Sequence, residues 1–468
     1  MIDRTVQEAE PKDNGLERLM FARISVWKVL LGLVFGMIVT VILLAAVRST
    51  AFGGKRFGLV GEAAMTVASI PATMHEALAA PDDFDLLRVN LPYEALPDGF
   101  SARAPGFTDP GFLLVARSDP KRQRSIVQIV RVRDGKVLKE YAPDILAINA
   151  RSTMRSRLLS LARDRKPRRY RMFHPFLLPD GGIIFQGESP LVRIDACGKI
   201  VWTLDGIFSH AIEQDGDGNF WVAYTNPNTK MTHVSPTFRE NEIAHISPAG
   251  KILSIVSLVK IFHDNGLEYL WRARDYTDEP FHLNDIQPVL KDGKYWKAGD
   301  LLISLRNLSM IMLYRPSTGK IIWSRDHPWR LQHDVNIIDD HRISVFDNNV
   351  LSAYQLASKP TDAVDGHSRL LVYDFATDSV SSPFESGFAN ANIRASQEGR
   401  GTLLPNGDLF VEETQFGRML RLSPDNKVRW QYIDADDKKR RYMLNWSRYL
   451  DPTTYADSIK AGVSAKCT

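Results

Sequence analysis

From Pro110 onward, apolar and polar residues alternate over short stretches that are separated by turns rich in Gly, Asn and Asp. A period of two is typical of β-strands with one buried face, and such turns are typical of hairpins. The pattern also repeats: a strand leads into a turn, an apolar strand follows, and a small hairpin closes the unit. Six such hairpins can be aligned, at residues 126–141, 191–204, 243–256, 311–324, 370–382 and 419–432.

Successive hairpin turns are separated by roughly 50 to 70 residues, a spacing typical of repeats with three or four short strands each. A β-sandwich would also use short strands, but six similar units fit a closed ring better. We therefore predict an all-β fold, a six-bladed β-propeller from about Pro110 to Asp434.

A different pattern lies near the N-terminus, where Val29 to Val47 form a run of 19 residues without a charge. As a helix this run would span roughly 28 Å, close to the hydrocarbon thickness of a bilayer. A cleaved signal peptide would have a shorter apolar core, and the basic residues on both sides argue against a buried helix. We predict a single transmembrane signal anchor at 29–47.

The chain has five Lys or Arg before this run and three shortly after it. Because cytoplasmic segments carry the excess of basic residues, residues 1–28 are predicted to be a cytoplasmic tail. The protein would then be a single-pass protein of the inner (cytoplasmic) membrane, with the propeller on the periplasmic side. Residues 48–109 would form a stalk or linker with a short helix before Pro81, and residues 435–468 a C-terminal extension.

Two insertions interrupt the repeat. Residues 147–171 carry nine Lys or Arg and have leucines at helical spacing, so we expect an amphipathic helix with a basic face. That face is either solvated on the rim, or residues 151–171 contact anionic lipid or a protein partner in a membrane complex. Nucleic acid is not an expected partner, because no base-stacking aromatic platform accompanies the insertion. Residues 262–280 would form a loop over one face.

Length and composition are those of a globular protein with a large core: 468 residues, 44% hydrophobic and 24% charged, with a formal net charge of +4. The two cysteines, Cys197 and Cys467, cannot make a disulfide framework, and Cys467 lies one residue from the C-terminus. They therefore give no indication of the redox compartment.

Three successive blades begin their first strand with a histidine, at His210, His282 and His333, whereas the sixth begins with Asn392. The innermost strands of a propeller converge near the axis, so these residues would face one another. One such histidine would be structural, but three at one repeat position predict a shared site. Arg306 ends an apolar strand in the repeat of His282, and its planar fork suits a tetrahedral oxyanion; a salt bridge to a neighbouring blade is the alternative.

Other chemistry is less well supported. Three converging histidines could bind a divalent metal, but Arg306 would oppose a cation, so we expect neither a metal nor a cofactor. The sequence DGDGN at 215–219 has the first spacings of a calcium loop without its glycine and glutamate, which favours a hairpin turn. The sequence contains no nucleophile elbow, phosphate-binding loop or dinucleotide fingerprint.

Four segments resemble those of the bacterial arylsulfate sulfotransferases, PAPS-independent enzymes built on a six-bladed propeller. HLNDI at 282–286, followed by SLRN at 304–307, resembles the family's His-x-Asn segment and its strand-borne arginine. QHDVNII at 332–338, followed by ISVFDNN at 343–349, resembles the segment with the nucleophilic histidine and its Asp-Asn corner. The stretch from Ser209 to Val222 resembles the first channel-histidine segment.

This resemblance implies that His333 attacks the sulfur of an aryl sulfate to form a transient sulfohistidine. A phenol would then accept the sulfuryl group in a ping-pong cycle. Arg306, His210 and His282 would neutralise the sulfuryl oxygens, and one of the histidines would exchange a proton with the phenolic oxygen. Asn284 and Arg306 would bind the substrate.

The N-terminal part departs from the family pattern, because an anchor and stalk stand where an additional β-domain is expected. The cysteine pair that accompanies some exported members cannot be placed either. An alternative function is therefore a catalytically silent propeller that serves as a binding or assembly subunit of a membrane protein complex.

Overall fold

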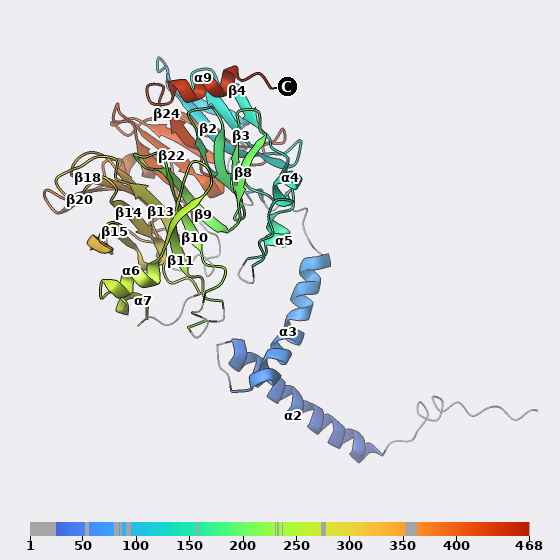
Figure 1. Ribbon diagram of the computed structural model, residues 1–468. Helices are drawn as coiled ribbons and strands as arrows, with labels where there is room; N and C mark the ends of the chain where they lie inside the picture. The colour runs from blue at the N-terminus through green and yellow to red at the C-terminus, as the bar shows by residue number, and fades with distance from the viewer. Residues whose placement is uncertain are drawn as a thin grey trace, which may run out of the picture. The chain divides into compact units, whose positions relative to one another are not determined.

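The computed structural model (Figure 1) describes residues 25–51, 56–78, 84, 87–89, 95–156, 159–229, 231, 234–235, 237–272, 278–351 and 363–467. The chain divides into two compact units, residues 1–81 and residues 82–468.

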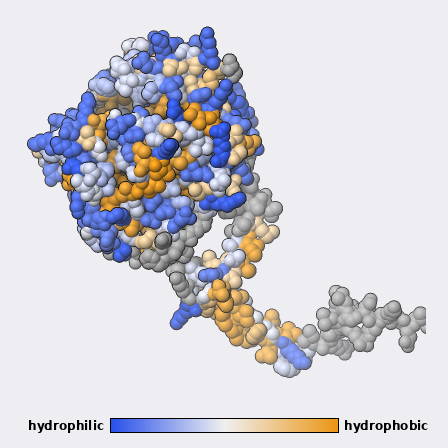
Figure 2. Space-filling model, in the orientation of Figure 1, coloured by the Kyte–Doolittle hydropathy of each residue, from blue (hydrophilic) through white to orange (hydrophobic). Residues whose placement is uncertain are grey.

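Among the described residues of the first unit there are two helices, α2 (Val26–Ala51) and α3 (Gly58–Leu78). Most apolar side chains of α2 are exposed, and Figure 2 shows them as a continuous orange surface along the helix. Among the described residues, α2 is the one helix that is long and apolar enough to cross a membrane, a property that it shares with signal sequences. The helix α3 is longer than the short helix expected before Pro81.

The second unit is a six-bladed β-propeller, as predicted (Figure 1). Blade 1 consists of β25 (Arg448–Leu450), β2 (Phe112–Asp119), β3 (Arg124–Arg131) and β4 (Lys136–Tyr141). Blade 2 consists of β5 (Phe173–Leu177), β6 (Ile183–Gln186), β7 (Leu191–Ile194) and β8 (Ile200–Leu204). Blade 3 consists of β9 (Ile207–Gln214), β10 (Phe220–Thr225), β11 (Asn241–Ile246) and β12 (Ile252–Ser257).

Blade 4 consists of β13 (Leu283–Pro288), β14 (Leu301–Leu305), β15 (Met310–Arg315) and β16 (Lys320–Arg325). Blade 5 consists of β17 (His333–Ile337), β18 (Arg342–Asp347), β19 (Arg369–Asp374) and β20 (Ser379–Ser381). Blade 6 consists of β21 (Arg400–Leu403), β22 (Leu409–Glu413), β23 (Arg418–Leu422) and β24 (Val428–Ile433). The strands β5, β9, β13 and β17 contact one another in succession, so the first strand of each blade lines the axis.

The ring is closed by segments from both ends of this unit. The strand β25 pairs with β2, with Arg448 opposite Leu114, and supplies the innermost strand of blade 1. The strand β1 (Gly99–Arg103) pairs with β24 and adds a fifth, outer strand to blade 6. The sheets therefore extend beyond Pro110–Asp434 on both sides. This closure pairs inner backbone edges that would otherwise be exposed.

Apolar cores lie between neighbouring blades and explain why the middle strands are apolar on both faces. Every residue of β10 is buried, and Trp221 packs in one cluster with Ile303 and Met312 of the next blade. The outermost strands are largely solvated, as the exposed Ile252, Leu253 and Ile255 of β12 illustrate. Among these outer strands, β16 shows the period-two pattern, with exposed and partly buried residues in alternation.

The basic insertion does not form one amphipathic helix, so that expectation was wrong. It contains two short helices, α4 (Ile145–Asn149) and α5 (Leu161–Asp164), and residues 157–158 lie outside the described part of the chain. The guanidinium of Arg165 holds the intervening segment in a non-helical path, because it donates to Met154 O, Ser152 Oγ and Ser189 Oγ. At least one of the basic side chains of the insertion, that of Arg165, therefore stabilises the fold instead of facing solvent.

The second insertion is not a simple loop in its described part: α6 (Leu258–Asp264) runs into it and α7 (Tyr269–Arg272) lies within it, and residues 273–277 lie outside the described residues. Phe262 and Trp271 are buried against Phe281, which immediately precedes His282. The insertion therefore supports the start of blade 4. Two 3₁₀ turns, η3 (Arg306–Leu308) and η6 (Thr414–Phe416), and the helix α8 (Glu385–Asn390) complete the ring.

The cysteines form a disulfide, Cys197–Cys467, with their Cα atoms 5.3 Å apart. The expectation that this pair could not be placed was wrong. The helix α9 (Ala456–Ser464) folds back onto β4 and brings the tail to the β7–β8 turn (Figure 1). A side chain at Gly181 would place its Cβ 2.2 Å from Gly462 N, so this approach requires glycine.

Candidate active site

One residue at or near the start of the innermost strand has a left-handed backbone in four successive blades. The φ angles are 47° at His174, 53° at His210, 49° at His282 and 47° at Asp334. The pairing registers of β5, β9, β13 and β17 each shift beside this position, as a β-bulge does. Bulges re-aim side chains, and here they accompany His174, His210 and His282 and, in blade 5, Asp334 directly after His333.

The structure brings together the three histidines that the sequence singled out. The ring centroids of His210 and His282 are 5.0 Å apart, and those of His210 and His333 are 6.3 Å apart. One ring nitrogen from each histidine lies within 4.8 Å of the other two. His333 is 1% exposed, and the other two are partly buried. A group the size of a sulfuryl or phosphoryl group could contact all three.

The tautomer of His333 is fixed by Asn348. The Nδ2 of Asn348 donates to the main-chain oxygens of Ala395 and Glu398, at 2.8 and 2.7 Å. Its Oδ1 must therefore accept from Nδ1 of His333, 2.7 Å away. The proton is thus on Nδ1, and Nε2 keeps the lone pair of a nucleophile.

His282 is held in an analogous way by a carboxylate. Its Nδ1 lies 3.1 Å from Glu279 Oε2, and Glu279 also pairs with Arg239 at 3.2 Å. Burial opposes the charge of Glu279, but His282 and Arg239 outweigh that effect and lower its pKa to about 2. Glu279 is therefore an acceptor, so Nδ1 of His282 donates to it and Nε2 is the nitrogen that remains for a ligand.

Arg306 supplies positive charge at the same place. It follows β14 in the turn η3, and its backbone N–H donates to His282 O at 3.1 Å. The side chain donates to Asn307, whose own amide is anchored on Glu279 O at 2.7 Å. This turn ties the guanidinium to the start of blade 4.

Two of the central histidines are neutral at physiological pH. Burial, followed by the charge of Arg306, lowers the pKa of His333 well below its ordinary value. Burial, followed by the charge of His282, lowers the pKa of His210 to about 3. An uncharged imidazole with a free lone pair is the reactive form of histidine as a nucleophile.

The cluster contains two residues that the sequence analysis missed. His174 occupies the same position in blade 2, and Trp446 packs against it with ring centroids 3.8 Å apart. Trp446 also lies 5.5 Å from His210 and 5.9 Å from His333. The similarity of FHPF at 173–176 to FHLN at 281–284 could have identified His174 as a further histidine of the cluster. Trp446 belongs to the C-terminal extension, which the repeat does not cover.

Asn284 lies beside the start of blade 5. It is 1% exposed, and its Nδ2 donates to Gln332 O at 2.7 Å, one residue before His333. Its Oδ1 is buried without a hydrogen-bond partner. The contact shows that Asn284 helps to hold the backbone that carries His333, and the role of binding substrate stays a prediction.

A buried ionic layer fixes β17 behind the histidines. Asp334 forms an ion pair with Arg400 at 3.2 Å and accepts from Gly401 N at 2.8 Å. Asp285 accepts from Val335 N at 2.7 Å. Burial, with the nearby charge of Asp334, raises the pKa of Asp285 well above its ordinary value. These contacts join blades 4, 5 and 6 around His333.

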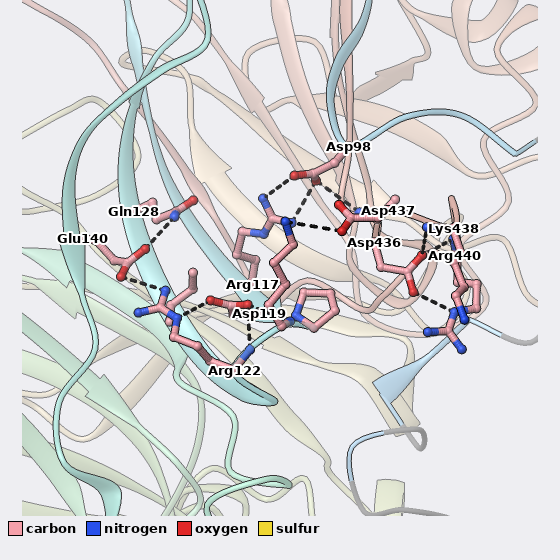
Figure 3. Close-up of a pocket in the computed structure, with 14 residues that line it drawn as sticks. Asp98, Arg117, Asp119, Arg122, Gln128, Glu140, Asp436, Asp437, Lys438 and Arg440 are labelled. Atoms are coloured by element: carbon pink, nitrogen blue, oxygen red, sulfur yellow. Dashed lines mark hydrogen bonds and ion pairs between the residues drawn. The ribbon is translucent and has the colours of Figure 1, made fainter.

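One cavity beside blade 1 has a different character (Figure 3). Its volume is about 420 Å³, and its wall consists mainly of charged residues of blade 1 and of 435–440. Figure 3 shows these charges paired with one another: Arg117 with Asp98, Arg122 with Glu140, and Arg440 with Asp436. Its lining includes none of the central histidines, so the chemistry of the molecule is better placed at the axis.

The ring nitrogens of the three histidines lie close enough to one another to coordinate a metal ion. The guanidinium of Arg306 acts on the same rings, because its charge lowers the pKa of both His333 and His210. A fixed positive charge that acts on these rings favours an anion over a cation beside them. The site is therefore best described as a pocket for an oxyanion with a nucleophile in its wall.

Comparison with known structures finds similar chains at low sequence identity. A protein of unknown function from Bacteroides caccae is 15% identical and covers 73% of this chain and 99% of its own, with a TM-score of 0.45. TolB from Acinetobacter baumannii is 11% identical, and the match covers 84% of this chain and 73% of TolB, with a TM-score of 0.42. Virginiamycin B lyase from Staphylococcus aureus is 15% identical, and the match covers 70% of this chain and 86% of the lyase, with a TM-score of 0.35. No curated protein matches the chain.

A comparison with protein families is more specific. The model of the arylsulfotransferases (ASST) matches residues 174–435, which is more than half of the 468 residues and includes every predicted site residue. This agrees with the resemblance seen in the sequence motifs. The chain therefore belongs to the arylsulfotransferase family.

Proposed function

We propose that this protein transfers a sulfuryl group from a phenolic sulfate ester to a phenol through a sulfohistidine at His333. The observation that carries the proposal is the hydrogen bond between Asn348 Oδ1 and His333 Nδ1, which leaves Nε2 as the nucleophile. Membership of the arylsulfotransferase family supports the reaction type.

In the first half-reaction, Nε2 of His333 attacks the sulfur, and the bond from sulfur to the phenolic oxygen breaks. The electron pair of that bond leaves with the phenolate. Arg306 would stabilise the charge on the sulfuryl oxygens, and His282 would do so when Nε2 carries a proton as well as Nδ1, since fixed donors in a water-poor site need no reorganisation. His210 is neutral, and its ring lies 5.0 Å from that of His282 and 6.3 Å from that of His333, so it would complete the pocket.

In the second half-reaction, the oxygen of an acceptor phenol attacks the same sulfur. The sulfur–nitrogen bond breaks, and its electron pair returns to Nε2. Sulfuryl transfer, like phosphoryl transfer, requires mainly in-line positioning and charge stabilisation. Trp446 offers an aromatic surface beside His333 on which a substrate ring can pack. Asn284 acts on the substrate or, through Gln332 O, on the position of His333.

The proposed location is the inner membrane, with α2 as a single-pass anchor and the propeller on the periplasmic side. The excess of basic residues before α2 supports this orientation. The disulfide supports it independently, because such bonds persist in oxidising compartments. The contact of residues 151–171 with anionic lipid or a protein partner remains a proposal as well.

The test is transfer from 4-nitrophenyl sulfate to phenol by the purified full-length protein in detergent. The wild type should release 4-nitrophenol and form phenyl sulfate, and His333→Ala should do neither. His263→Ala, at an exposed histidine of α6, is the matched control and should keep full activity. Absence of turnover in folded wild-type protein would favour the alternative, a catalytically silent subunit of a membrane complex.

A further inference from the structure

One carboxyl group lies over the axis on the side of the histidines. Glu398 precedes β21 of blade 6, and its side chain is 21% exposed. Its Oε2 is buried without a hydrogen-bond partner and lies 3.8 Å from Nη2 of Arg171, which precedes β5 of blade 2. The charge of His282, at the start of blade 4, acts to lower the pKa of Glu398 against the effect of burial.

Blades 2, 4 and 6 alternate around the ring and share no edge. Glu398 precedes the innermost strand of blade 6 and meets Arg171 just before the innermost strand of blade 2, so its side chain lies near the axis. Arg171, the partner from blade 2, is itself anchored beside the cluster, because it donates to Asn445 Oδ1 and to Leu444 O. The carboxyl group of Glu398 is thus held beside the segments that carry Trp446 and His333.

The backbone of Glu398 is part of the same construction. Its φ angle is 55°, a left-handed conformation that is costly for a residue with a side chain. Its main-chain oxygen accepts from Asn348, the residue that fixes the tautomer of His333. The strained turn therefore places a carboxyl group and holds the nucleophile through consecutive hydrogen bonds.

The proposed transfer needs such a group. An acceptor phenol has a pKa near 10, so at neutral pH it must lose its proton as it attacks. His333 carries the sulfuryl group at that moment, and the low pKa of His210 makes that residue a poor proton acceptor. Burial raises the pKa of Glu398, an effect that Arg171 partly offsets, which moves the carboxyl group toward the range of an effective general base.

We propose that Glu398 exchanges the proton of the phenolic oxygen in both half-reactions. As a carboxylate it takes the proton of the acceptor while the phenolic oxygen bonds to sulfur and the electron pair of the sulfur–nitrogen bond returns to His333. As a carboxylic acid it returns that proton to the phenolate that leaves the next donor. The cycle is balanced without a further reactant, and the inference rests on the proposed sulfuryl transfer.

The experiment uses full-length Glu398→Gln in detergent, with 4-nitrophenyl sulfate as donor and two acceptors. One acceptor is phenol, and the other is an electron-poor phenol that is already ionised at the assay pH. The burst of 4-nitrophenol without acceptor should be unchanged, because this leaving group needs no proton. Transfer to phenol should fall by roughly 100-fold or more, whereas transfer to the ionised acceptor should stay near the wild-type rate.

Glu242→Gln is the matched control. Glu242 is also a largely buried carboxyl group with a raised pKa, but burial and Glu240 cause the shift, and its partner is Asn226 in blade 3. Glu242→Gln should not change the ratio of the transfer rate to phenol to the transfer rate to the ionised acceptor. Equal rates of Glu398→Gln and wild type with phenol would overturn the inference, as would loss of the burst, which would assign Glu398 to positioning His333. Absence of a burst in the wild type would instead refute the proposed function.

Discussion

The side-chain oxygen of Asn348 lies 2.7 Å from Nδ1 of His333 and can only accept, because the amide nitrogen is committed to two main-chain oxygens. This relationship decides which nitrogen of His333 reacts. It also links blade 6 to the nucleophile of blade 5, since both oxygens belong to the segment before β21.

Replacement of Asn348 tests that link. Asn348→Ala leaves the tautomer of His333 unfixed, so the rate of the 4-nitrophenol burst should fall by about 10- to 100-fold, the usual effect of removing a residue that orients a functional histidine. Asn228→Ala, at an exposed asparagine of blade 3, should leave the burst unchanged. A normal burst in Asn348→Ala would show that the hydrogen bond has no role.

The pH dependence of the burst reports on the electrostatics of His333. Because burial and Arg306 lower its pKa, the rate should hold as the pH falls through 6.5, the ordinary pKa of histidine. Arg306→Gln removes a positive charge, so the acid limb should move toward neutral pH, while the maximal rate falls by about 100-fold. Stopped-flow bursts from pH 4.5 to 8 give both quantities, and an acid limb that does not move would contradict this role of Arg306.

The sequence predicted the site because its residues recur at one position of a repeat. His210, His282 and His333 could be recognised before the structure, as could the corner that contains Asn348. His174 follows the same pattern in FHPF, yet it stands in a blade without the other motifs. The single basic helix was not predicted correctly, because the contacts of Arg165 with Ser189 and Met154 join residues that are distant in sequence.

Closure of the ring could not be predicted for a similar reason. The strand β25 is three residues long and pairs with β2 more than 300 residues earlier. The cysteines are separated by 270 residues and meet only because α9 folds back. Local hydrophobic patterns contain no information on such distant pairs, and both Trp446 and the disulfide depend on them.

Stability should depend on pH through the buried neutral histidines. Burial, followed by Arg448 and Arg400, lowers the pKa of His174 well below 6.5 in the folded protein. Below pH 6.5 the unfolded chain therefore binds a proton that the folded one does not, and the free energy of unfolding falls as the pH falls. The contribution is absent above pH 6.5 and reaches about 1.4 kcal/mol per pH unit for each such histidine.

His174→Gln cannot take up this proton. Its free energy of unfolding, measured by urea titration with tryptophan fluorescence, should therefore fall less steeply between pH 6.5 and 5 than that of the wild type. The comparison concerns the slope, so a uniform loss of stability in the variant does not affect it. Parallel curves for the two proteins would refute the assignment of His174 as a neutral buried group.

The disulfide should stabilise the closed ring. Cys467→Ser releases the tail beyond α9 from the β7–β8 turn and should lower the free energy of unfolding by roughly 2–4 kcal/mol. A reducing agent should have the same effect on the wild type and none on Cys467→Ser. A wild-type unfolding curve that does not respond to reduction would count against this bond and against its use as support for a periplasmic location.

The central claim is a covalent bond between sulfur and Nε2 of His333. The most direct measurement is mass spectrometry of peptides from protein that has been mixed with 4-nitrophenyl sulfate without acceptor and digested at alkaline pH. The account predicts that the peptide containing His333 gains the mass of one SO₃ group and loses it when phenol is added before digestion. An unmodified His333 peptide after a measurable burst, or the same added mass on a different residue, would contradict it.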